Sequence, residues 1–357
     1  MADPHMATPA PSAPPTRLPY QPATSPRASA PGAVSPAESD GFSWKYWAFR
    51  AAGALAPLVP LWLARPLMVA GGWVAWALVW PLRRRAEWNM GHIPALAADP
   101  VKRRRAARQA FVALALNYLD FFRGRRVTSE ELARGWDIQG WDVFTRALAL
   151  GKGMIVLGAH YGPFEYAAWM LGDLGHPTII PAERLKPERL HHLVSVMRNH
   201  HGTRMIAGDE RETLRELIAA LRRGDIVVFA VDRWVMGPSS PWPLFGAPAR
   251  LPTAPFALAA RSDAPVFLLA PRRSGLNRFA GVIEPLTPER VEPARAAEAS
   301  AQAERGGDRE AAVARMRARV YPAIERLIAE EPGQWVSALS TIWRAPTNPS
   351  GEDRDVS

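Results

Sequence analysis

The feature that most constrains the fold of this chain is a short, continuous apolar run at residues 155–157, followed closely by a histidine and a glutamate. Such a run is typical of a strand that is buried on both faces of a parallel sheet. A Gly-Pro pair at 162–163 ends it, and proline is favoured in the first turn of a helix, so we expect a helix to begin near Pro163. His160 then lies at the carboxyl end of the strand and Glu165 in the opening turn of the helix. Both side chains are expected to face the crevice beyond the sheet, where open α/β folds bind ligands.

An imidazole beside a carboxylate is suited to removing a proton from a hydroxyl, because the carboxylate fixes the ring tautomer and stabilises the imidazolium that forms. The chain has no cysteine, and no Gly-x-Ser-x-Gly segment adjoins His160, so an acyl-enzyme route has no obvious nucleophile. The alternative is that His160 and Glu165 form a purely structural hydrogen-bonded pair. From these two residues alone, both interpretations stand.

The spacing of His160 and Glu165 resembles the His-x4-Asp/Glu motif of the lysophospholipid acyltransferase superfamily, in the branch that contains the late acyltransferases of lipid A and the phosphatidylinositol mannoside acyltransferases. Three later segments agree with that branch in order and spacing: AERLKPERL at 182–190, GDIVVFAVDR at 224–233 and LFGAPARLP at 244–252. The first of these resembles the mannoside group in particular. The similarity covers about residues 45 to 345, and only the combination of motifs is specific. One departure is Pro-Trp-Pro at 241–243, where relatives often carry acidic residues.

The resemblance implies a membrane-bound O-acyltransferase with His160 as general base and Glu165 as its partner. It further implies a substrate-binding set made of Glu183, Arg184, Asp232 and Arg233. The acyl group would come from a thioester, acyl-coenzyme A or acyl carrier protein, and pass to a hydroxyl of a glycolipid like phosphatidylinositol mannoside, without a cofactor. A lipid A-type (Kdo-lipid) acceptor and a lysophospholipid are alternatives. A second class of function is a non-catalytic lipid-binding protein, against which the intact His160 and Glu165 argue.

The N-terminal part of the sequence divides into two regions of contrasting composition. The first forty residues contain ten Pro, nine Ala and five Ser, and such a segment buries too little apolar surface to offset its ordering entropy, so we expect disorder. Seven of the fourteen Trp then fall between Trp44 and Trp88, and residues 51–82 carry one charge, Arg65. This pattern predicts a membrane interface. The uncharged run 66–82 is near the lower length limit for crossing a bilayer, so a span, a re-entrant anchor and segments lying in one leaflet all remain open. Buried helices of a soluble protein are the alternative.

Basic residues follow this apolar region directly. Residues 83–126 hold eleven Lys or Arg and three Asp or Glu, a local net charge of +8 out of the formal +10. Three arginines at 83–85 indicate the cytoplasmic side of the membrane, so we expect the cytoplasmic face of the inner membrane. The clusters at 102–105 and 123–126 suit anionic head groups or an acidic carrier, although solvated helix faces would look the same. No nucleic-acid-binding module is recognisable, so nucleic acid is not an expected partner.

The rest of the sequence alternates strand and helix patterns, which predicts an α/β fold: a three-layer domain with a central, mostly parallel sheet flanked by helices. Strands are expected at 178–181, 204–206, 226–231, 266–269 and 279–283, and helices at 187–201, 209–223, 253–261 and 311–330. Residues 292–308 read as a loop. The predicted organisation is a disordered tail (1–40), a membrane-anchoring, basic helical region (41–126), an α/β acyltransferase domain (127–345) and a flexible tail (346–357).

Metal binding is not expected. The absence of cysteine excludes disulfides, thiolate metal sites and iron–sulfur ligation. The histidine pairs at 191–192 and 200–201 fall on an expected surface helix without a metal-ligand spacing.

Overall fold

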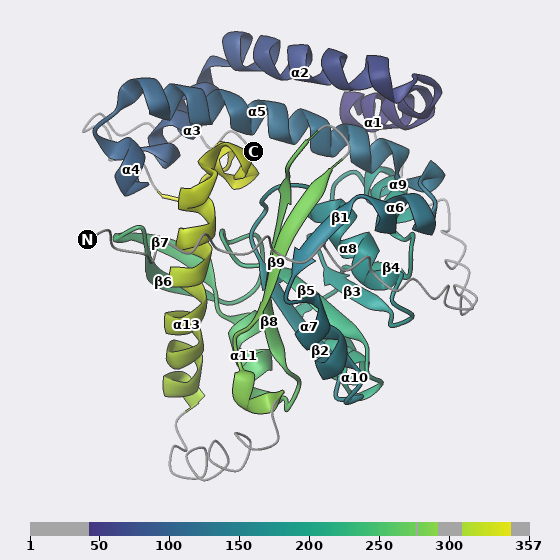
Figure 1. The fold of residues 1–357 in the computed structure, drawn as a ribbon, viewed down its shortest axis with the longest axis vertical. Coiled ribbons are helices and arrows are strands. Elements are labelled where there is room, and N and C mark those ends of the chain that lie inside the picture. The colour runs from purple at the N-terminus through teal and green to yellow at the C-terminus, as the bar shows by residue number, and fades with distance from the viewer. Residues whose placement is uncertain (1–42, 276–277, 292–308, 344–357) are drawn as a thin grey trace, which may run out of the picture.

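The structure, a computed structural model, describes residues 43–275, 278–291 and 309–343. A central sheet lies between two layers of helices, and a group of N-terminal helices lies across one end of it (Figure 1). The predicted tails at 1–40 and 346–357 and the predicted loop at 292–308 lie outside the described residues.

The central sheet has seven strands, of which those from β8 to β4 run parallel to one another. β9 pairs antiparallel with β8, and β1 pairs parallel with β9. In spatial order the strands are β1 (Trp136–Gln139), β9 (Phe279–Pro285), β8 (Val266–Arg273), β2 (Met154–Gly158), β5 (Ile226–Ala230), β3 (Thr178–Pro181) and β4 (Thr203–Ile206). The predicted α/β class and mostly parallel sheet are confirmed.

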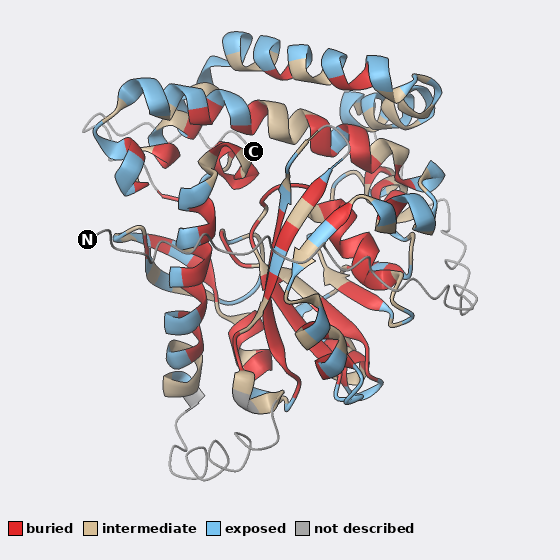
Figure 2. Ribbon diagram, in the orientation of Figure 1, coloured by how far each residue is buried: buried red, intermediate tan, exposed pale blue. Residues whose placement is uncertain are grey.

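Alternating residues of the central strand β2 belong to two separate cores. Val156 packs with the apolar residues of α7 (Trp141–Leu148) and α8 (Phe164–Gly172). Leu157 packs with those of α10 (Glu210–Arg222), α11 (Ala254–Arg261) and α13 (Arg309–Glu330). Figure 2 shows the buried residues concentrated on the strands and on the inner sides of these helices. Because successive strand side chains point to opposite faces, a run such as 155–157 is continuously apolar when both faces are covered.

The N-terminal helices form a layer across the end of the sheet. Asp99 caps the longest, α5, by accepting hydrogen bonds from the backbone N–H groups of Val101 and Lys102. α2 lies along the outer side of α5 for much of its length (Figure 1). The helices are α1 (Trp44–Leu55), α2 (Leu61–Leu78), α3 (Trp80–Met90), α4 (Pro94–Ala97) and α5 (Pro100–Arg123), followed by α6 (Ser129–Arg134), which packs on α8.

Most expected elements are present with ends shifted by a few residues. The largest differences are at two element ends. β8 continues to Arg273, four residues beyond the strand expected at 266–269, and the helix expected at 187–201 is α9 (Glu188–Arg198), which ends three residues early. His200 and His201 therefore lie in a turn beyond it, and His201 is mostly buried against Asp173, so their placement on a surface helix was wrong. The motif segment at 244–252 is part of a β-hairpin, β6 (Ser239–Leu244) with β7 (Ala247–Pro252), that strand propensity alone did not indicate.

Two adjacent glycines of α2 provide a test of its packing on α5. A Cβ added to Gly72 would lie 2.8 Å from the Cα of Val112 in α5, whereas one added to Gly71 meets nothing within 4 Å. Gly71→Ala should therefore stabilise the protein by roughly 0.5–1 kcal/mol through helix propensity. Gly72→Ala should instead lower the melting temperature, because overpacking costs about 1–3 kcal/mol. Thermal unfolding of both variants in the same detergent checks this. Equal stabilisation by both would show that the two helices do not pack closely.

Candidate active site

Strand register brings His160 and Asp232 together. β2 and β5 are parallel neighbours, and their last paired residues are Gly158 and Ala230. His160 and Asp232 each follow two residues later, so they leave the carboxyl edge of the sheet side by side. Nδ1 of His160 lies 2.9 Å from Oδ1 of Asp232. When Nδ1–H donates a hydrogen bond to the carboxylate, Nε2 keeps a free lone pair. The His160 side chain lines a cavity.

Asp232 is an ionised carboxylate with no solvent exposure. Its Oδ2 accepts a hydrogen bond of 2.9 Å from the indole Nε1 of Trp335, which is also fully buried. Burial raises the pKa of Asp232, but the charge and hydrogen bond of His160, together with the Trp335 hydrogen bond, outweigh it and lower the pKa to about 2. The side chain therefore stays negatively charged throughout the physiological pH range.

Glu165 is not the residue that contacts the imidazole. It is buried in the first turn of α8, and its Oε1 accepts hydrogen bonds from Nε and Nη2 of Arg198 at 2.9 and 2.5 Å. The expectation that Glu165 holds the His160 ring is corrected, since that contact is made by Asp232. The physical reason is that His160 precedes the turn at 162–163 and faces the neighbouring strand end, whereas Glu165 follows the turn and faces α9. The expectation that both side chains face one crevice is confirmed, because both line the cavity.

The cavity has a volume of about 1030 Å³, at the upper end of the range for small-molecule sites. It opens where β3 and β5 separate: Ile179 and Val227 are still paired, and the next residues, Ile180 and Val228, line the cavity. Its walls come from α5, α8 and α9 on one side and from α10 and α11 on the other. Most of the lining is apolar and includes Phe49, Tyr118, Phe121, Val194, Leu214 and Leu258.

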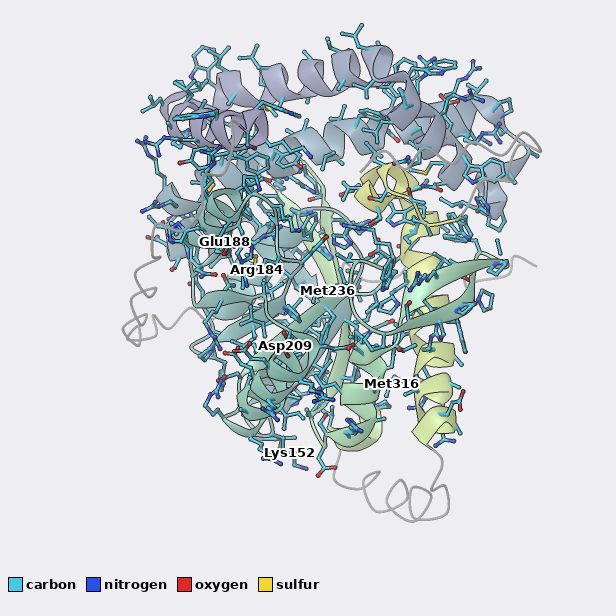
Figure 3. The ribbon with its side chains drawn as sticks, turned by 180° about the vertical axis from the view of Figure 1, so that it is seen from behind. Lys152, Arg184, Glu188, Asp209, Met236 and Met316 are labelled. Atoms are coloured by element: carbon cyan, nitrogen blue, oxygen red, sulfur yellow. The ribbon has the colours of Figure 1, made fainter. Side chains whose placement is uncertain are left out.

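The four residues expected to bind substrate lie in three different places: on the cavity wall, beneath His160, and on the surface outside the cavity. Glu183 and Arg233 line the cavity. Asp232 lies beneath His160 with no exposed surface, so the expected direct contact with substrate is corrected to a contact with the imidazole. Arg184 is exposed and not among the lining residues. It forms two hydrogen bonds of 3.0 Å with Glu188, one turn away at the start of α9, and Figure 3 labels both residues there.

Three functional contacts were missed by the sequence analysis. Arg198 and Trp335 hold the two carboxylates, and Asn117 of α5 donates to the carbonyl of Gly162 at 2.7 Å. Gly162 has φ +55°, and a Cβ there would lie 2.2 Å from the carbonyl oxygen of Pro271, so glycine is required in the turn that carries His160. None of these contacts has a local sequence signal, because each joins residues more than thirty positions apart.

No group of three or more metal-ligating side chains is present within residues 43–275, 278–291 and 309–343. The polar groups that meet at this point are the imidazole of His160, the carboxylate of Asp232 and the indole N–H of Trp335.

Comparison with known proteins places the chain in a family. Residues 41–341 match the family model described as bacterial lipid A biosynthesis acyltransferase, which covers most of the chain. The chain belongs to this family. It is also 29% identical over 188 residues to proteins named phosphatidylinositol mannoside acyltransferase from two strains of Mycobacterium tuberculosis, H37Rv and CDC 1551. That alignment spans 51% of this chain and 58% of the relatives.

The Glu165–Arg198 pair gives a prediction that does not depend on activity. Arg198→Met leaves a mostly buried carboxylate without its donor and should destabilise the protein by about 1–3 kcal/mol. Arg184→Met removes a comparable pair with Glu188 that is exposed, and should leave stability unchanged. Chemical denaturation of the two variants measures the difference. An equal, negligible effect of both would show that Glu165 finds another donor.

Proposed function

We propose that this protein is a membrane-bound O-acyltransferase in which His160 acts as the general base. Nε2 takes the proton of an acceptor hydroxyl as that oxygen attacks the carbonyl carbon of an acyl thioester. The new C–O bond forms, the C–S bond breaks, and the proton passes to the departing thiolate. The observation that carries this proposal is the contact of His160 with the buried, ionised Asp232, because a fixed negative charge stabilises the imidazolium.

The start of α8 supports stabilisation of the oxyanion. Pro163 precedes α8 and provides no side-chain cap, so the first backbone N–H groups of the helix remain available beside His160. These groups and the positive end of the helix dipole favour negative charge at that point. Arg233, which lines the cavity, is a further candidate for binding an anionic part of either substrate.

The proposed acceptor is a glycolipid of the phosphatidylinositol mannoside kind, since two relatives carry that name. The proposed donor is acyl-coenzyme A or an acyl carrier protein, and the large apolar cavity supports a fatty acyl chain. A lipid A-type acceptor is the second candidate, because the family model carries that description. Lipid mass spectrometry of cells with and without the protein tests this directly, since the acylated species that is lost identifies both the acceptor and the chain.

The N-terminal helices support attachment to a membrane from one side. Of the described helices, α2 is the one long and apolar enough to cross a bilayer by length and composition. Its inner side packs on α5, where Arg65 is buried and Gly72 meets the Val112 backbone. Figure 2 shows its outer side exposed along most of its length. Exposed indoles of this layer are those of Trp44, Trp47, Trp62, Trp73, Trp80 and Trp88. We therefore favour α2 lying in the interface of one leaflet, on the cytoplasmic face.

The two carboxylates near His160 should respond differently to substitution. His160→Ala should abolish acyl transfer, and Asp232→Asn should lower kcat by about 10²–10⁴, as loss of general-base catalysis typically does. Glu165 acts with Arg198 and not with His160, so Glu165→Gln and Arg198→Gln should lower kcat by similar factors. The double variant should lower kcat little more than either single variant does. His192→Ala, on the exposed side of α9, is the control with unchanged activity. Near-wild-type turnover by His160→Ala or Asp232→Asn would refute the mechanism.

Membrane attachment gives a second prediction. Trp62→Ser with Trp73→Ser removes two exposed indoles from α2 and should weaken binding to anionic lipid vesicles by roughly tenfold or more, since burying a large apolar side chain contributes ~1.5–3 kcal/mol. The control is Leu150→Ser, which removes an exposed apolar side chain two residues from Lys152, at the opposite end of the molecule (Figure 3). Vesicle co-sedimentation compares the variants. Unchanged binding by the tryptophan variant would place the membrane contact elsewhere.

A further inference from the structure

The C-terminal segment is built into the turn that carries His160. The backbone N–H of Val336 donates to the carbonyl of His160, and the N–H of Gly162 donates to the carbonyl of Gln334, both at 3.0 Å. Tyr161 and Trp335 form an antiparallel bridge between these two bonds. Trp335 lies between two short 3₁₀ helices, Pro332–Gln334 and Val336–Leu339. Residues 334–336 therefore pair with residues 160–162 as a further strand would.

This pairing places the Trp335 indole beneath the site. The side chain is fully buried, and its Nε1 donates to Oδ2 of Asp232 while Oδ1 accepts from His160. Each carboxylate oxygen thus has its own donor, and the two bonds together fix the rotation of the carboxylate. Without the indole N–H, Oδ2 would be a buried, charged acceptor left without this donor, which is an unfavourable state.

We propose that Trp335 is a positioning residue for acyl transfer, which acts through Asp232 by holding the carboxylate in the orientation that His160 requires. The inference rests on the function proposed above. It also assigns the segment 334–337 to the active site, and two residues of this segment, Val336 and Ser337, line the cavity.

Trp335→Phe tests the proposal, since it keeps an aromatic ring and removes the N–H. We expect kcat to fall roughly tenfold, with KM within twofold of the wild type, because one hydrogen bond to a charged group is lost away from the substrate. Trp343→Phe is the matched control. Trp343 is also buried, packs edge-on to Trp335 and donates its Nε1–H to the carbonyl of Ala247, so its loss should lower the melting temperature but leave kcat unchanged.

A double-mutant cycle separates positioning from packing. In an Asp232→Asn background, Trp335→Phe should reduce kcat by less than twofold further, because the indole has lost the charge through which it acts. Full multiplication of the two losses would show that Trp335 acts on the fold alone, and wild-type kcat in the single variant would also overturn the proposal.

Two further measurements keep these outcomes distinct. If Trp335→Phe does not fold, replacement of the indole by benzothiophene at position 335 removes the N–H at nearly constant shape, and the same tenfold loss is expected. His160→Ala is assayed in parallel with the same thioester and acceptor. An active His160→Ala variant would refute the proposed function itself, whereas an inactive His160→Ala beside a fully active Trp335→Phe would refute only the role of Trp335.

Discussion

The interaction on which the rest of this structure depends is the buried negative charge of Asp232. A carboxylate without solvent is costly unless charged or polar donors surround it, so the chain must bring an imidazole from the end of β2 and an indole from near the C-terminus to the end of β5. These three segments are distant in sequence and meet at the carboxyl edge of the sheet. The indole that helps to make the buried charge tolerable also fixes the carboxylate, and the carboxylate in turn orients the imidazole toward the cavity. Stability and the proposed chemistry therefore draw on one set of contacts.

The position of the cavity follows from the sheet and from the helices laid across its end. β3 and β5 stop pairing before either strand ends, and this opening in the sheet borders the same cavity that His160 lines. α5 lies over this opening and supplies Asn117, Tyr118 and Phe121 to its lining. α2 packs on the outer side of α5 and exposes indoles to the surroundings.

The sequence predicted much of the fold, because buried parallel strands and amphipathic helices leave local patterns. Both ends of the strand expected at 178–181 agree with β3, and the run 155–157 lies in the central strand β2. The site was predicted less completely. Glu165 was chosen as the partner of His160 because it is near in sequence and matches a family motif, yet Asp232 makes the contact. The choice between two carboxylates depends on which strand lies beside β2, and no local pattern contains that information.

The sequence by itself determined the local groups of the fold: an apolar strand followed by His160, an Asp-Arg pair after a second apolar strand, and a Trp-rich N-terminal region beside clustered arginines. Only the tertiary structure decided which of these groups meet. Parallel register placed Asp232 beside His160, the turn at Gly162 directed Glu165 to Arg198, and the return of the chain placed Trp335 beneath Asp232. Hydrophobic periodicity is a property of neighbouring residues, whereas hydrogen-bond partners are set by the arrangement of strands and helices that are far apart in the chain.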